Sequence, residues 1–489
     1  MHALADQLSH TRRRETVKLD PKAPEVVFKN ALVALVLETS SDPARLSAAL
    51  SPYFAPELVA GLSAPEGRAA MAQARETLVA KTGNLPVEVL ADLIIGAEIM
   101  VEGDATAGYR VRWTTQGGSG PMSAFLGMRP GGPRVVGIAP ASGPAAGAET
   151  LRFLAAGDLA SARRWLDWSV EGQALGTADD PLGGSTLARL WTRGSATTDR
   201  ARIARAAAAL LANDPTLAAS SALPALEPCR ASAAAGLGET ERSACLVALA
   251  DAYHTLKRWN DLLAVGTILL ELYPTSPRAV ISRSIALSEL GRFKEQQAML
   301  QEALRRRPDL QVAEWSLESS LARSGDLAGA EAIARRAAEA PTRTEGDFNQ
   351  LAWIALCRGD VGDATLAAAR RAVELGNRRH GSSLHTLAAV LAERDAPEEA
   401  FQILLELFEM RGEATPTSAD WYVLGRIAEG YGVPEAAVAA YARVEKPRMA
   451  DLMSTWTLAD RRASKLKLGA APAPAPQGAV PAALRPRKP

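Results

Sequence analysis

Residues 421–444, WYVLGRIAEGYGVPEAAVAAYARV, contain three glycines that could cradle a phosphate group. A phosphate-binding P-loop needs a lysine and a serine or threonine directly after its second conserved glycine, because these side chains reach the phosphates and the magnesium ion. In this chain Gly430 is followed by Tyr431 and Gly432, and no strand is expected before the segment. The sequence therefore predicts a structural role for these glycines and gives no sign of a nucleotide cofactor.

The cysteines could supply a nucleophile or metal ligands, but their spacing suits neither role. Cys229, Cys245 and Cys357 form no CxxC pair, the spacing common in zinc sites. Cys245 and His254 are expected on one helix, and at about 1.5 Å of rise per residue their separation is too long for contact. We therefore predict that Cys245 and Cys357 are buried packing residues and that catalysis does not use them.

The histidines and the overall charge do not favour an ionic ligand either. His380 and His385 are five residues apart, which places them on different faces of a helix and predicts no metal site. The 489 residues carry a formal net charge of zero, so the chain has no basic field that would gather nucleic acid. We predict no metal, no cofactor and no nucleic-acid partner.

The compartment follows from the same residues. Three scattered cysteines favour a reducing environment, and the N-terminal segment as written resembles no secretory signal, so a cytoplasmic protein is expected. Export stays open if the start codon is misassigned. The most apolar runs, 31–37 and 93–101, are much shorter than the roughly 20 residues that a spanning helix needs, so no membrane insertion is expected.

Two patterns divide the chain. Residues 25–145 combine helical spacing up to about Gly83 with four short β-type runs, at 93–101, 109–115, 123–128 and 134–139, and predict a small α+β domain with an antiparallel sheet. In the second run apolar residues alternate with Arg110 and Arg112, as one buried and one solvated sheet face require. The stretch ASGPAAG, 141–147, predicts a boundary, after which only helices are expected.

The helical part repeats itself. Lys257, Gly291, Gly325 and Gly359 follow one another at intervals of 34 residues, and each is followed two positions later by an apolar residue. Asp395 and Gly432 continue the series after intervals of 36 and 37, with the extra residues expected in loops. Each interval predicts a helix, a tight turn at that position and a second helix with small residues where the two helices approach.

This pattern resembles the tetratricopeptide repeat (TPR) family. The segment 421–444 carries the resemblance best, with Trp421, Leu424 and Gly425 in the first helix, Gly432 at the turn, and Ala437, Tyr441 and Val444 in the second helix. The resemblance implies a mainly α fold, a right-handed α-solenoid with six units at 240–446. Around them we expect a disordered segment at 1–24, a degenerate helical extension at 146–239, a capping helix at 447–469 and a disordered Pro/Ala-rich tail at 470–489.

In this family the first helix of each unit lines a concave groove, which predicts a non-catalytic scaffold that binds a peptide or protein segment. The lysine and asparagine arrangement that clamps a terminal carboxylate in some members is missing, which disfavours such a ligand. The sequence fixes no oligomeric state. The expected groove residues are Asp251, His254, Arg278, Ser282, Trp315, Ser319, Arg323, Asn349, Trp353, His385, Tyr422 and Arg426.

The alternative places function in the N-terminal domain, as a small-molecule pocket or hydrolase-like module to which the repeats are accessory. Residues 25–145 contain no histidine and no cysteine, which leaves the carboxylates Glu98, Glu102 and Asp104. Whether Glu98 lies in a pocket or is exposed on a flat sheet distinguishes the two hypotheses.

Overall fold

A computed structural model of the chain describes residues 20–38, 42–65, 67–68, 70–72, 74, 89, 99–114, 121–138, 143–177, 180–192, 194, 199–214, 218–231, 237–411, 415–447 and 451–466. The contacts divide the chain into two compact units, Met1–Ser282 (unit 1) and Arg283–Pro489 (unit 2). The disorder predicted for the N-terminal segment and for the tail 470–489 concerns residues outside the described ranges, apart from residues 20–24.

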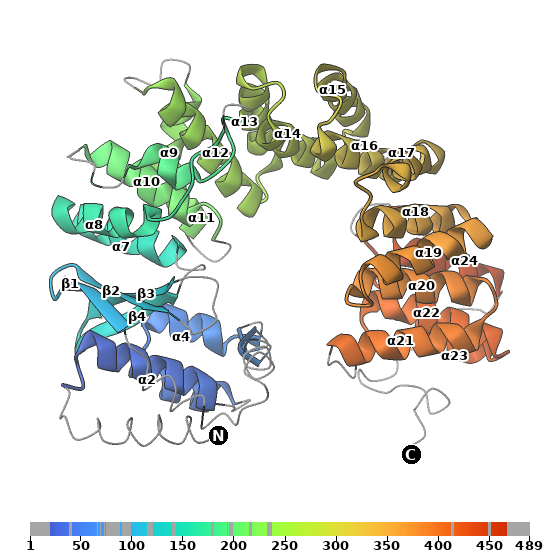
Figure 1. The fold of residues 1–489 in the computed structure, drawn as a ribbon, viewed down its shortest axis with the longest axis horizontal. Coiled ribbons are helices and arrows are strands. Elements are labelled where there is room, and N and C mark those ends of the chain that lie inside the picture. The colour runs from blue at the N-terminus through green and yellow to red at the C-terminus, as the bar shows by residue number, and fades with distance from the viewer. Residues whose placement is uncertain are drawn as a thin grey trace. The chain divides into compact units, whose positions relative to one another are not determined.

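Unit 1 contains the predicted antiparallel meander, which the structure confirms (Figure 1). The strand order is β1-β2-β3-β4, and each strand pairs with the next in the chain. The described part of the first strand starts at Ile99 and continues three residues beyond the predicted end at Val101, and residues 91–98 lie outside the described ranges. The strands are β1 (Ile99–Asp104), β2 (Gly108–Thr114), β3 (Pro121–Arg129) and β4 (Gly132–Ile138).

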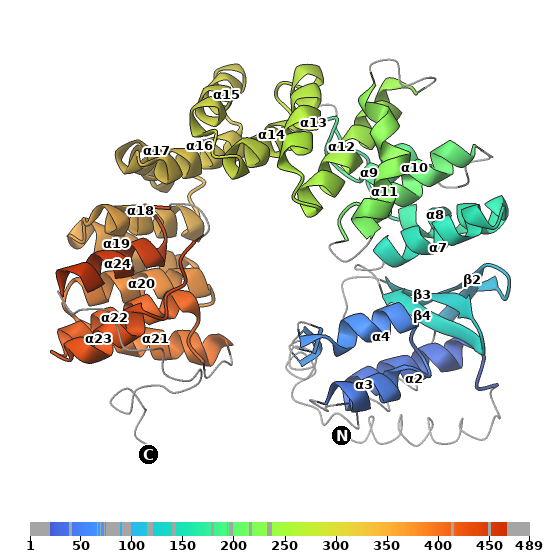
Figure 2. The same ribbon diagram turned by 180° about the vertical axis from the view of Figure 1, so that it is seen from behind.

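Helices cover both faces of this sheet, so the prediction of one solvated face is wrong. On one face Phe28 of α2 packs in a buried cluster with Val111 and Leu126. On the other face Trp165 donates from Nε1 to the carbonyl of Ala107 over 2.7 Å, and this side buries Arg110. Figures 1 and 2 show the sheet between these helices. The helices are α2 (Pro24–Leu37), α3 (Pro43–Leu50), α4 (Pro56–Ser63), α7 (Gly143–Ala155) and α8 (Leu159–Val170).

The segment 141–147 contains the start of a helix, although its Gly/Pro content predicts a boundary. Helix α7 begins at Gly143 and buries Gly147 closely: a Cβ there would lie 2.8 Å from the carbonyl oxygen of Ala207. The extension after the sheet is helical, as expected. Its further helices are α9 (Thr186–Leu190), α10 (Arg200–Leu211), α11 (Ala218–Leu226) and the 3₁₀ turn η1 (Glu227–Arg230).

Six helical hairpins follow, and they confirm the predicted fold class of tetratricopeptide-type helix–turn–helix units. All six predicted turn positions have positive φ, including Lys257 at 55° and Asp395 at 57°, where a non-glycine residue adopts the left-handed conformation at some cost. The pairs are α12 (Glu239–Thr255) with α13 (Trp259–Leu272), α14 (Pro277–Glu289) with α15 (Phe293–Arg306), α16 (Gln311–Ser324) with α17 (Leu327–Glu339), α18 (Glu345–Arg358) with α19 (Asp363–Leu375), α20 (Gly381–Glu393) with α21 (Pro397–Arg411), and α22 (Ser418–Gly430) with α23 (Pro434–Tyr441).

Local sequence signals set the ends of these helices and their close approach. Thr344 and Asp347 form a reciprocal capping box at the start of α18. Their side chains accept hydrogen bonds from two backbone N–H groups that have no partner within the helix. At Gly425 a Cβ would lie only 2.3 Å from Cε1 of Tyr441 in the paired helix. The close-packing role predicted for Gly425 is therefore confirmed.

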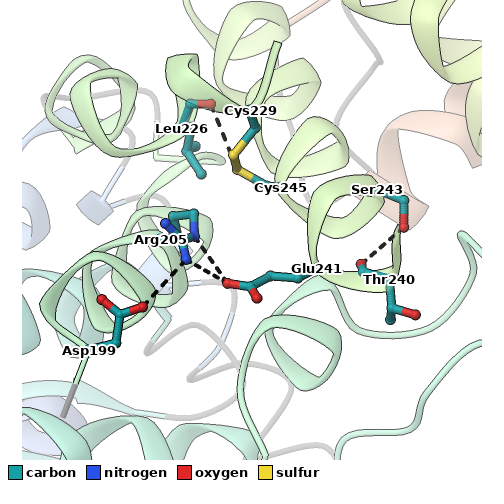
Figure 3. The surroundings of a disulfide bond; sticks show 8 residues. All are labelled: Asp199, Arg205, Leu226, Cys229, Thr240, Glu241, Ser243 and Cys245. Atoms are coloured by element: carbon teal, nitrogen blue, oxygen red, sulfur yellow. Dashed lines mark hydrogen bonds and ion pairs between the residues drawn. A yellow bond between two sulfur atoms is a disulfide. The ribbon is translucent and has the colours of Figure 1, made fainter. Parts of the chain in front are cut away.

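A disulfide corrects the prediction that Cys245 is a lone packing thiol. Cys229 of η1 and Cys245 of α12 are bonded, at a sequence separation of 16, and both side chains are buried (Figure 3). Nearby, Arg205 of α10 pairs with Glu241 of α12 over 2.7 Å. The bond and this ion pair tie the degenerate extension to the first clear hairpin. Cys357 is a buried free thiol, as predicted.

After the last hairpin, helix α24 (Thr455–Lys465) forms within the predicted capping region. Ser454 caps its N-terminus by accepting from the amide of Thr457 over 3.1 Å. Among the described residues, none of the helices combines the length and the apolar character that crossing a membrane requires.

Candidate functional site

The predicted groove residues of unit 2 occupy equivalent places in successive hairpins. Trp315, Asn349, His385 and Tyr422 each lie ten residues before the turn residue of their unit, on α16, α18, α20 and α22. Four residues further along, Ser319, Trp353, Ala389 and Arg426 lie on the same side of these helices. We call this surface the first-helix face. Its exposure falls along the chain, from 52% at Trp315 to 9% at His385 and 0% at Tyr422.

The chain's own C-terminal segment, residues 451–466, contacts this face. The indole Nε1 of Trp353 donates to the carbonyl of Met453 over 3.0 Å, and Trp353 also lies against the ring of His385. Arg461 donates to the carbonyl of Cys357 at the end of α18. Figure 2 shows α24 in front of the helices that carry these residues. Residues 451–466 therefore occupy part of the groove predicted for a partner.

Charged groups continue this contact onto the last two units. Arg462 of α24 donates from Nε to Oε1 of Glu393 over 3.1 Å. The same carboxylate accepts from the hydroxyl of Tyr422 over 2.6 Å and lies 3.0 Å from Nε of Arg426. Arg426 also pairs with Glu429 at 3.0 Å and is only 3% exposed. Burial raises the pKa of Tyr422. Tyr422 and Arg426 thus form a buried polar network below α24.

The first-helix face is more open at α16. Trp315 is the most exposed large side chain there, and Arg323 donates to Ser288 of α14. Glu318 on the same helix is buried, and this burial raises its pKa to about 7, with Asp347 and Glu314 adding in the same direction. The side chain of Trp315 is therefore accessible to a partner, whereas Arg323 is partly buried against α14 and α15.

The groove residues predicted in unit 1 also come together. Arg278 of α14 forms an ion pair with Asp251 of α12, and burial raises the pKa of this carboxyl group. His254 lies against the ring of Trp259 with 5.9 Å between centroids. Ser282 accompanies them, buried, with its hydroxyl donating to the carbonyl of Arg278 over 2.8 Å.

Two parts of this site have no counterpart among the predicted residues. Arg189 on α9 is buried beside Asp251, and its Nη1 donates to the carbonyl of Pro181 over 2.9 Å. It lies in the degenerate extension, where no repeat register assigns a residue to a face. The second part is the segment 451–466. Its spacing of Trp456, Ala459, Ala463 and Leu466 indicates an apolar stripe but not the surface that receives it.

A hollow of about 560 Å³ lies elsewhere in unit 2, between α19, α20 and α21. Its floor includes Val373 and Leu391, and Arg370 and Arg378 border it. Arg370 pairs with Glu399 at 3.1 Å, and Arg378 pairs with Glu406. Both cations that border the hollow are therefore already paired.

The N-terminal carboxylates of the alternative hypothesis are held by arginines. Glu102 pairs with both Arg110 and Arg112. Asp104 accepts from the backbone amide of Ala107 and pairs with Arg164, and these contacts lower its pKa to about 2. Glu98 lies outside the described residues. Within the described ranges no group of three or more histidine, cysteine or acidic side chains is placed to hold a metal ion.

Solved structures with the same kind of helical repeat resemble the chain. One is a tetratricopeptide repeat protein from Parabacteroides merdae, with 13% identity over 66% of this chain and 98% of that one at a TM-score of 0.36. Another is YrrB, a TPR protein described as having an unusual peptide-binding site, with 16% identity over 41% of this chain and 97% of that one and a TM-score of 0.29.

A third similar structure is the human IFIT1 dimer with m7Gppp-AAAA, with 14% identity over 63% of this chain and 69% of that one and a TM-score of 0.34. At these identities and scores the likeness concerns only the fold of the repeats. No protein-family model and no curated protein matches the chain.

Proposed function

We propose that the protein is a non-catalytic interaction scaffold that binds a segment of a partner protein on its first-helix face. The observation that carries this proposal is the exposed Trp315 on α16, together with the segment 451–466, which already contacts Trp353 on the first helix of the next hairpin. Aromatic and arginine side chains dominate binding energy at protein interfaces. Stacked hairpins keep such a surface rigid, so little ordering cost falls on the scaffold when it binds.

The test uses two exposed aromatic residues of unit 2. Trp315→Ala removes the proposed anchor, whereas Tyr431→Ala removes a side chain of similar exposure, 47%, at the turn between α22 and α23. Tagged full-length variants are recovered from native cells, and the co-purified proteins are quantified. The proposal expects the Trp315 variant to lose a partner that the Tyr431 variant retains, at equal melting temperatures. Retention of every partner by both variants overturns it.

The disulfide bears on the cellular compartment in which the protein acts. Bonds such as Cys229–Cys245 persist in oxidising compartments and are rare where glutathione and thioredoxin keep thiols reduced. We infer that the scaffold acts in an oxidising compartment, in place of the cytoplasm that the cysteine count suggests. Alkylation of the protein during denaturing lysis of the cells, without a reductant, tests this inference: a single modified cysteine supports it, and three modified cysteines contradict it.

A further inference from the structure

We propose that α18, α20, α22 and α23 form a binding site for a basic amphipathic helix, and that a partner helix takes the place of α24 there. This inference rests on the proposed scaffold function and names the class of partner and the way in which access is controlled. Residues 451–466 would then act as an internal ligand that covers the site until a partner competes for it.

The contact has the chemistry of a helix bound in a groove. Leu458 and Ala459 are buried, and Met453, Trp456, Ala463 and Leu466 pack partly buried against the same cluster of unit 2. Amphipathic helices bind grooves through side chains with this kind of spacing. The groove adds one directional contact, because the indole of Trp353 binds the backbone carbonyl of Met453, an atom that a partner helix of different sequence also offers.

Two carboxylates below α24 require that a helix bound there carries a positive charge. Glu393 and Glu429 lie below α24, with side chains 13% and 14% exposed, and share the buried Arg426. One cation balances only one of these two carboxylates, and Arg462 supplies the second cation from α24. A partner helix therefore needs a lysine or arginine four residues after a buried leucine, as Arg462 follows Leu458.

The attachment of α24 favours exchange over permanent capping. Helix α24 has only 11 residues, and isolated helices of that length are marginal in water, so α24 depends on the surface for its structure. Its contacts include ion pairs and backbone carbonyls, and interfaces that open are more polar than permanent ones. The surface also continues past the segment to the exposed Trp315, which gives a longer partner helix a contact that α24 does not use.

The experiment opens the site in the full-length chain. Leu458→Asp with Arg462→Glu removes both anchors of α24. The matched control, Ser464→Asp with Lys465→Glu, makes the same change of charge at exposed positions of the same helix. The probe is a fluorescein-labelled peptide of residues 451–466, and binding is measured by fluorescence anisotropy. We expect the opened variant to bind the peptide at least ten times more tightly than the wild type and the control do.

A second variant guards against misfolding of the first. A protease site replacing residues 448–450 allows the tail to be cut from an otherwise unchanged folded chain. We expect the cut tail to dissociate on dilution and to exchange with the labelled peptide. A tail that stays bound at every dilution and never exchanges shows that α24 is a fixed cap and overturns the proposal, as does equal peptide binding by the opened variant and the wild type. The scaffold function fails separately, through the Trp315 comparison.

Discussion

Replacing Arg426 tests whether the last hairpins depend on a buried charge network. The guanidinium is 3% exposed and lies 3.0 Å from both Glu393 and Glu429. Arg426→Met keeps much of the aliphatic volume of the side chain. It removes the positive charge that neutralises the mostly buried carboxylates of Glu393 and Glu429. Removing one partner of a buried ion pair costs about 3 to 5 kcal/mol. Since Arg462 still contacts Glu393, we expect the lower value, about 3 kcal/mol.

Native-state hydrogen exchange is the suitable assay, because a repeat array of this length does not unfold as a single two-state domain. A decrease of about 3 kcal/mol in the free energy of opening accelerates amide exchange in α20 and α22 roughly 100-fold. Arg370→Met is the control: Arg370 and Glu399 form an exposed pair, so about 0.5 kcal/mol or less is expected. The reasoning is refuted if the Arg426 and Arg370 variants exchange alike. Adding Glu393→Gln to Arg426→Met should recover part of the loss.

Three further predictions concern other parts of the fold. Reduction of Cys229–Cys245 should destabilise unit 1 by about 3 kcal/mol, seen as a lower melting temperature in dithiothreitol that the Cys229→Ala, Cys245→Ala variant does not share; three free thiols in the unreduced, denatured protein would contradict the bond. Gly425→Ala should cost about 1 to 3 kcal/mol, because its methyl group meets the ring of Tyr441, and unchanged exchange in α22 would show that the ring moves aside at little cost. Glu318 has a pKa raised to about 7, so folding favours its neutral form. Its contribution to the stability of the folded state is complete below about pH 4.5 and is lost as the pH rises to about 7. Glu318→Gln should remove that pH dependence from the stability of unit 2, whereas Glu339→Gln, at an exposed position of α17, should preserve it.

The sequence predicts the repeat well because the same backbone turn recurs in every unit and requires the same kind of residue. Each turn needs a left-handed residue, and glycines mark four of the six turns directly, three of them 34 residues apart. Lys257 and Asp395 are recognised as turn residues only from their distance to the neighbouring turn positions, because their residue type does not favour a positive φ. The helices on either side impose the left-handed conformation on them. Gly425 is recognisable because its place in the unit matches a known contact position.

The remaining features depend on contacts between distant segments. The burial of Arg110 depends on α8, and no alternation within a strand indicates which helix covers its second face. Spacing alone does not pair Cys229 with Cys245. Sequence position places Trp353, Tyr422 and Arg426 on the first helices, but whether a partner or the chain's own C-terminal segment contacts them depends on where 451–466 folds back. The binding roles of the groove residues stay predictions.

The central claim, that the first-helix face receives a partner segment, is tested most directly by photo-crosslinking in the native cell. A photoreactive amino acid replaces Trp315 in one full-length variant and Tyr431 in another, and crosslinked peptides are identified by mass spectrometry. The account predicts that position 315 captures one partner reproducibly, through a segment with an amphipathic helical pattern and basic residues, and that position 431 does not. Equal capture at both positions, or no protein captured at 315, would contradict it.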